Sequence, residues 1–180
     1  IAELGAGGPQ SAKTGTAALA QDRRRRYWVA ISDHDGMSII SSDDLKKWSP
    51  RRPIRPDVQG RKWDISLVAL ESGELIAAYC MDGNLLICHS SRDGRTWTDP
   101  VQVSKNTSYP VRHCKLFPGP DRSILVSWKS TGPIMMARSN DAGRKWSDFL
   151  LALPFTFGSH LTTHFLYEGQ SRYRAFWGAE

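Results

Sequence analysis

The 180-residue sequence predicts an all-β repeat protein, and three observations support this prediction. A motif that begins with serine and ends with tryptophan seven residues later occurs three times, and successive copies are 49 residues apart. Short runs of β-branched, aromatic or alternating apolar residues recur between turn sequences, while no segment has a sustained helical period. Hydrophobic residues make up 40% of the chain and charged residues 23%, which excludes a disordered or fibrous protein.

The repeat is defined by the three copies of the motif, at residues 41–48, 90–97 and 139–146. Other positions obey the same interval of 49 residues. The two additional columns are Tyr79, Trp128 and Trp177, and Leu67, Leu116 and Phe165. Because three motifs and two columns share one period, we interpret the chain as a series of structural repeats.

Each repeat is expected to form four short antiparallel strands, which is typical of one blade of a β-propeller. Turn sequences such as Asp82-Gly83-Asn84 separate the expected strands. These strands are expected at 13–20, 26–32, 37–42, 50–54, 65–70, 74–81, 85–90, 99–104, 111–117, 123–129, 134–139, 148–153, 161–167 and 172–177. The resulting single domain has blades at about 13–55, 64–104 and 111–153, a partial blade at 161–180 and an irregular lead-in at 1–12.

An incomplete ring is expected from the length of the chain. Six blades of this size need about 294 residues, and a propeller closes its ring to remove exposed sheet edges. We therefore interpret the sequence as about 3.5 blades of a longer protein, whose remaining blades complete the ring, or, less favoured, as a half-propeller that dimerises. The chain begins with Ile1 and shows no signal peptide, so the localisation is left open.

The repeated Ser-x-Asp-x-Gly-x-x-Trp motif resembles the Asp box of the sialidase-superfamily, BNR-repeat propellers. The third copy matches at every defined position, the second has Arg92 at the Asp position, and the first has Leu45 instead of glycine. The structural Asp-box residues implied by the resemblance are Ser41, Asp43, Trp48, Ser90, Asp93, Gly94, Trp97, Ser139, Asp141, Gly143 and Trp146. Their Ser and Asp side chains are expected to accept hydrogen bonds from turn amides, and the Trp rings to pack beneath the turn. Leu45 predicts a modified turn in the first box.

The Asp boxes are expected on the face of the disc opposite the active site. Strands within a blade alternate in direction, so the box turns share one face with the arginine run at 23–26. In sialidase-like propellers the opposite face contains the active site, so the resemblance implies a structural rather than a catalytic or calcium-binding role for the boxes.

Candidate site residues come from the loops and inner-strand starts on that opposite face. The resemblance implies an acid/base aspartate in the segment 32–37, and arginines that grip a substrate carboxylate. The candidate catalytic residues are Asp35, Asp33 and Asp64, and the candidate substrate-binding residues are Arg112, Arg61, Asp82 and His113. Each of them also fits a solvated loop residue, and His113 also fits a core histidine. The chain lacks the Arg-Ile-Pro motif of the family, with Lys13-Thr14-Gly15 in its place.

The resemblance implies a sialidase-like exo-glycoside hydrolase that acts on terminal sugars of glycans. The alternatives are a non-catalytic Asp-box propeller used as a binding or assembly scaffold, and an arabinanase-like hydrolase, since residues 42–48 also resemble a turn found there. The expected ligand is a sugar, with no metal or cofactor. Despite the net charge of +6, no nucleic-acid motif or membrane-length apolar run is present. The three cysteines, Cys80, Cys88 and Cys114, are expected to be buried free thiols.

Overall fold

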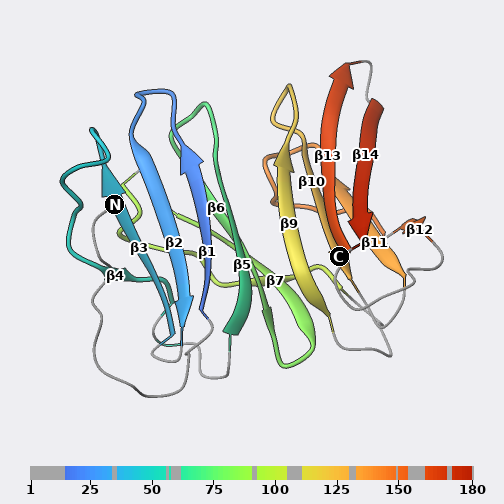
Figure 1. Ribbon diagram of the computed structural model, residues 1–180, viewed down its shortest axis with the longest axis horizontal. Helices are drawn as coiled ribbons and strands as arrows, with labels where there is room; N and C mark the ends of the chain where they lie inside the picture. The colour runs from blue at the N-terminus through green and yellow to red at the C-terminus, as the bar shows by residue number, and fades with distance from the viewer. Residues whose placement is uncertain are drawn as a thin grey trace.

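The computed structural model describes residues 15–33, 36–55, 57, 62–90, 93–104, 111–129, 133–148, 150–153, 161–169 and 172–179. These segments form three four-stranded antiparallel sheets and one two-stranded sheet, and they contain no helix (Figure 1). In each four-stranded sheet the strands lie in chain order, as in a propeller blade. The predicted all-β architecture of propeller blades is therefore confirmed. The described sheets form an open arc rather than a closed ring.

The strand bounds follow the 49-residue repeat closely. The first blade consists of β1 (Thr16–Gln21), β2 (Tyr27–Asp33), β3 (Gly36–Ser42) and β4 (Arg52–Pro53). The second consists of β5 (Lys62–Ala69), β6 (Leu75–Met81), β7 (Asn84–His89) and β8 (Val101–Gln102). The third consists of β9 (Arg112–Pro118), β10 (Ile124–Lys129), β11 (Ile134–Ser139) and β12 (Leu150–Leu153). The two-stranded sheet consists of β13 (Leu161–Gly169) and β14 (Arg172–Ala179). Outer strands β4 and β8 pair over two residues each, less than the sequence predicts.

The hydrophobic core consists of two layers, each buried between neighbouring blades. Trp28 and Tyr79 belong to the layer between the first and second blades, and Trp128 belongs to the layer between the second and third. All three side chains are fully buried, so the aromatic column at Tyr79 and Trp128 is a core feature. The cysteines at 80, 88 and 114 are free and buried, as predicted. Burial between blades explains why successive repeats stabilise one another.

The tryptophans that end the boxes are partly buried in all three repeats. Trp97 packs against the layer between the first and second blades, and Trp146 against the layer between the second and third. Trp48, Trp97 and Trp146 are each only half-buried. The three rings therefore have the same intermediate burial at equivalent positions of the repeat.

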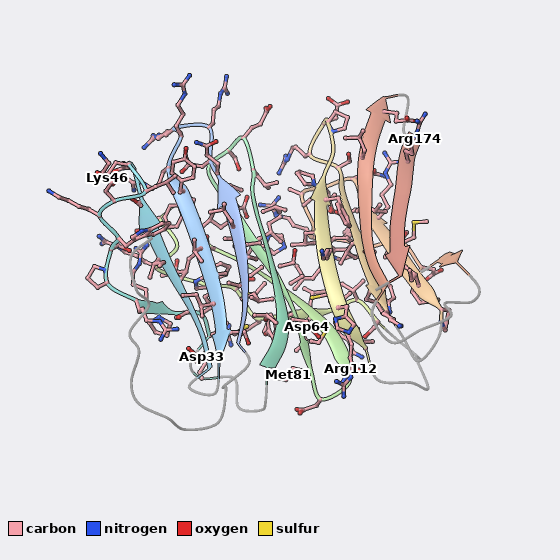
Figure 2. All side chains as sticks on the ribbon, viewed as in Figure 1. Asp33, Lys46, Asp64, Met81, Arg112 and Arg174 are labelled. Atoms are coloured by element: carbon pink, nitrogen blue, oxygen red, sulfur yellow. The ribbon has the colours of Figure 1, made fainter. Side chains whose placement is uncertain are left out.

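The two ends of the blades carry different residues, as Figure 2 shows. Asp33, Asp64, Met81 and Arg112 lie at one end of the sheets, which we call the axial face. Lys46 lies at the opposite end, which we call the box face, as does the turn between β1 and β2. The described segments include no helix that could cross a membrane.

Candidate functional site

The inner strands β5 and β9 each contain a bulge at the same position of the repeat. The register of β5 on β6 shifts between Trp63 and Ser66, and that of β9 on β10 shifts between Ser127 and Lys129. In each case two residues of the inner strand lie opposite one buried aromatic residue, Tyr79 or Trp128.

Each bulge contains a non-glycine residue with a left-handed backbone. Asp64 has a φ of 51° and His113 has a φ of 54°, and the two positions are one repeat apart. The next residue of each bulge, Ile65 or Cys114, is buried in the core. A left-handed backbone costs free energy at such residues, and strain of this kind is concentrated at binding and active sites. The bulges therefore mark the axial ends of β5 and β9 as the best candidate site.

The carboxylate of Asp64 is held by the bulge of the neighbouring blade. The backbone amide of His113 donates a hydrogen bond to Asp64 Oδ2 at 3.0 Å, and His113 Nδ1 lies 3.7 Å from Asp64 Oδ1. The Cys114 thiol donates to the backbone carbonyl of Asp64 at 2.6 Å. Burial, together with the neighbouring Cys80, raises the pKa of Cys114 well above its ordinary value, which keeps that thiol protonated as a donor. The Asp64 side chain is 17% exposed and that of His113 is 48% exposed. The carboxylate is thus fixed in position and still open to a ligand.

Asp33, on the first blade, is engaged in an ion pair within that blade. Arg51 Nη2 donates to Asp33 Oδ2 at 2.7 Å, and Arg51 Nε donates to Ser38 Oγ at 3.1 Å. The Asp33 side chain is 20% exposed. Its partner Arg51 is absent from the sequence-based list of candidates, because a lone arginine beside a short outer strand has no motif to mark it.

Of the other candidates, two are described in the structure and two lie outside the described residues. Arg112 is exposed and directly precedes the bulged His113. Asp82 is exposed in the hairpin turn between β6 and β7, with a φ of 49°. The structure thus brings Asp64 and His113 into contact with Arg112 adjacent in sequence, and places Asp33 at the same end of the sheets (Figure 2). Asp35 and Arg61 lie outside the described residues.

The third Asp box has the hydrogen bonds that its motif predicts. Ser139 Oγ donates to Asp141 Oδ1 at 2.8 Å and accepts from the Gly143 amide at 2.7 Å. Asp141 Oδ1 accepts from the amides of Lys145 at 2.8 Å and Arg144 at 3.1 Å. The Lys145 amide, above all, lowers the pKa of Asp141 below its ordinary value. Trp146 Nε1 donates to the Gly143 carbonyl at 2.9 Å, so the ring closes the turn.

Gly143 also joins the second and third blades. A Cβ atom at this position would lie 3.1 Å from Cε1 of His89, and the φ of Gly143 is 80°. His89 is buried, and its Nε2 lies 3.0 Å from the Gly143 carbonyl oxygen. Gly94 of the second box approaches the first blade equally closely, because a Cβ atom at Gly94 would lie 3.2 Å from the ring of Trp28. Glycine is therefore needed at both boxes for a close approach between blades.

The first box is formed one residue later than the sequence alignment predicts. Ser42 Oγ donates to Asp44 Oδ1 at 3.1 Å and accepts from the Leu45 amide at 2.9 Å. Asp44 Oδ1 accepts from the amides of Lys46 at 2.8 Å and Lys47 at 2.9 Å, and the Lys47 amide, above all, lowers the pKa of Asp44.

Ser41 and Asp43, which the sequence alignment places in the first box, therefore do not make the box bonds. Asp43 instead forms an ion pair with Arg26, whose Nε lies 2.7 Å from Asp43 Oδ1. The turn is one residue shorter than the third box, which agrees with the predicted modification. Leu45 nevertheless takes a φ of 61°, a conformation that leucine adopts only at a cost.

The second box keeps the left-handed glycine of the motif. Gly94 has a φ of 65°, and the Arg95 amide donates to Asp93 Oδ1 at 3.0 Å. Ser90 forms an isolated bridge with Trp97, which closes the turn. Among the described residues, no group of three or more His, Cys, Asp or Glu side chains is placed to hold a metal ion.

Comparison with known proteins identifies relatives in structure but not in sequence. A scan against models of protein families and a search of curated proteins found no match. In structure, the chain is similar to an endo-arabinase from Bacteroides thetaiotaomicron, with 16% identity over 88% of this chain and 68% of that chain and a TM-score of 0.61.

Two further solved structures are similar over much of this chain. An α-L-arabinanase from Penicillium chrysogenum is 14% identical over 89% of this chain and 60% of that chain, with a TM-score of 0.61. The NanB sialidase from Streptococcus pneumoniae is 21% identical over 71% of this chain and 21% of that chain, with a TM-score of 0.53. At these identities the likeness shows the fold alone, and that fold is a series of β-propeller blades.

Proposed function

We propose that the chain forms part of a glycoside hydrolase of the propeller type, with Asp64 as a carboxylate of the active site. The observation that supports this proposal is the paired bulge, in which the His113 amide holds the Asp64 carboxylate at 3.0 Å on the axial face. Most glycoside hydrolases use two carboxyl groups at the scissile bond, one to protonate the leaving oxygen and one to activate water or attack the sugar, whereas sialidases use a tyrosine as the nucleophile. A fixed, partly exposed carboxylate such as Asp64 suits the second of these roles.

The finer proposal is a sialidase-like enzyme that releases a terminal acidic sugar. Here Arg112, one residue before His113, grips the sugar carboxylate through its planar fork of donors. Asp33 or Asp35 provides the acid/base group that the Asp-box resemblance implies. Since Asp33 already accepts from Arg51 at 2.7 Å, it would donate a proton only after this ion pair opens, which favours Asp35.

An arabinan-type substrate is the second candidate, and a specific observation favours it. The first box is formed by Ser42 and Asp44, which lie in the same segment, 42–48, that resembles an arabinanase turn. The two arabinanases have a TM-score of 0.61 with this chain, compared with 0.53 for the sialidase. A neutral pentose polymer needs no carboxylate clamp, so on this alternative Arg112 is not essential.

A substrate panel distinguishes these candidates. The protein is incubated with a fluorogenic sialoside and with linear arabinan oligosaccharides, and the released fluorophore and reducing ends are measured. Hydrolysis of the sialoside supports the sialidase-like proposal, and hydrolysis of arabinan alone supports the second candidate. Binding of either sugar without any hydrolysis by the folded protein would refute the enzyme and favour a non-catalytic scaffold.

A further inference from the structure

An arginine-rich groove runs along the seam between the first and second blades, away from the axial site. Three adjoining cavities of about 340, 320 and 510 Å³ form it. The first and second share Arg26, and the second and third share Arg52 and Arg95. Cavities of this size suit small ligands or single residues of a polymer, and their contiguity suits an extended chain.

The turn that opens the groove is held in one conformation by Asp22. Asp22 Oδ1 accepts from the amides of Arg24 at 2.9 Å and Arg26 at 3.0 Å. Its Oδ2 accepts from Trp28 Nε1 at 3.0 Å. The run of arginines at 23–26 is therefore displayed on a fixed turn rather than on a flexible loop.

Several arginines of the groove keep their charge available. The side chains of Arg23 and Arg24 are exposed and make no ion pair within the described residues. Arg52 lies over the Trp28 ring, with Cζ 5.7 Å from the ring centroid, and its Nη1 donates to the Asp93 carbonyl at 2.8 Å. Arg52 Nε is buried and has no acceptor in the described part of the chain. A carbonyl and an aromatic ring do not neutralise the positive charge of a guanidinium, so Arg52 can still attract an anionic group.

Acidic side chains alternate with these arginines. Asp43 pairs with Arg26 at 2.7 Å, and Asp93 pairs with Arg95 at 3.2 Å. The groove therefore offers both forked donors for carboxylates and acceptors for hydroxyl groups. A uronic acid residue presents both kinds of group, a carboxylate for the arginines and several hydroxyls for the aspartates.

Two tryptophans line the groove, Trp28 at one end and Trp97 at the other, and they provide little surface for stacking bases. Proteins that bind single strands stack bases on exposed aromatic rings. The Trp28 ring is only 1% exposed and has Arg26 and Arg52 over it, so it offers no face to a base. Trp97 is a single half-buried ring, and the comparison with DNA tests whether it stacks on a base.

We propose that this groove is a second carbohydrate-binding site, which holds an acidic polysaccharide of uronic acid residues. The site opens on the box face and the outer rim of the blades, so it is independent of the axial site and of any hydrolysis there. Its effect would be to anchor the protein on an acidic glycan while the axial face remains free.

The test is the binding of polygalacturonate by affinity electrophoresis at low ionic strength, with neutral arabinan and a single-stranded DNA oligonucleotide as comparison ligands. The informative variant is Arg23→Ala/Arg24→Ala. Its matched control is Lys46→Ala/Lys47→Ala, which removes the same charge from the box face at two exposed residues that do not line the groove. Circular dichroism confirms that both variants are folded, and Arg52→Lys, which keeps the charge but loses the fork, is the second informative variant.

We expect polygalacturonate to bind, the Arg23/Arg24 variant to bind at least about tenfold more weakly, and the lysine control to stay within about twofold of the wild type. We expect Arg52→Lys to weaken binding as well, and this variant decides the outcome if the arginine pair does not fold. Equal losses in the arginine and lysine variants would overturn the proposal in favour of general charge attraction. DNA binding as tight as polygalacturonate binding would assign the groove to nucleic acid instead. Absence of polygalacturonate binding would refute the proposal.

Discussion

The backbone amide of His113 donates a hydrogen bond to the Asp64 carboxylate at 3.0 Å, which joins the bulges of two neighbouring blades directly. The two residues are related by the 49-residue repeat, and both have a left-handed backbone. One copy of the bulge thus supplies a carboxylate and the next copy supplies the donor that fixes it. The repeat places two different residues, Asp64 and His113, at the same bulge position, and their contact forms the centre of the candidate site.

The buried and the half-buried tryptophans should differ in their contribution to stability. Trp128→Ala is expected to cost about 3–5 kcal/mol, because the ring is fully buried. Trp146→Ala is expected to cost about 2–3 kcal/mol, because the half-buried ring loses less contact and one hydrogen bond to Gly143. Urea unfolding of both variants measures the difference. A larger loss of unfolding free energy for Trp146→Ala than for Trp128→Ala would show that the box contributes more to stability than the layer between blades.

The first Asp box should become more stable when Leu45 is replaced by a residue that adopts a left-handed backbone more easily. Leu45 is 50% exposed with a φ of 61°, so Leu45→Asn is expected to stabilise the protein by about 0.5–1 kcal/mol. Leu19→Asn is the control, because Leu19 is also an exposed leucine but lies in strand β1, where asparagine is unfavourable. Thermal unfolding compares the two variants. If Leu45→Asn destabilised the protein as much as Leu19→Asn, the turn at Leu45 would not be strained.

Acid should weaken the third box through Asp141. The pKa of this carboxyl is lowered from 3.8 in the folded protein, so its charge stabilises the fold above that pH. That stabilisation is lost as the pH falls from 3.8 through the folded value. Wild type should therefore be more stable than Asp141→Asn at about pH 6, and the gap should be narrower at about pH 3.

Urea unfolding at both pH values measures this gap, with Asp121→Asn as a control on the same face. Asp121 lies in the exposed turn between β9 and β10, where its side chain accepts no hydrogen bond within the described residues. A gap for Asp141→Asn that does not change with pH would mean that the shape of the side chain, not its charge, supports the turn.

The blades were predictable from the sequence because one period governs both the turns and the core. The strand β11 was predicted with its observed limits. Tyr79 and Trp128, which occupy the same position of the repeat, are both fully buried. The register of the first box was not predictable. Doublets of serine and of aspartate precede Trp48, so two alignments differ by one residue, and only the turn geometry selects Ser42 and Asp44.

The candidate site was predictable in its position but not in its construction. Strand direction alone placed Asp64 and Arg112 on the face opposite the boxes. The bulges were not predictable, because Asp64 and His113 are ordinary residues for a strand end and nothing in the sequence marks a left-handed backbone there. The pairing of Asp33 with Arg51 depends equally on how the outer strand folds back, which no local pattern specifies.

The role of Arg112 should appear in substrate affinity. If the substrate is an acidic sugar, Arg112→Lys keeps the charge but loses the forked pair of donors, so we expect KM for a sialoside to rise about tenfold with a smaller change in kcat. Steady-state kinetics on the fluorogenic sialoside measure both constants. An unchanged KM would show that Arg112 does not contact the sugar carboxylate and would favour the neutral substrate.

The central claim, that Asp64 is a carboxylate of a sugar-cleaving site, is tested most directly by the hydrolysis rate of Asp64→Asn on whichever glycan the wild type cleaves. Asp121→Asn is the matched control, because it makes the same chemical change at an exposed turn on the box face. We predict that Asp64→Asn lowers kcat by at least about a hundredfold, while it stays folded by circular dichroism and Asp121→Asn remains as active as the wild type. Wild-type turnover by folded Asp64→Asn would contradict the account.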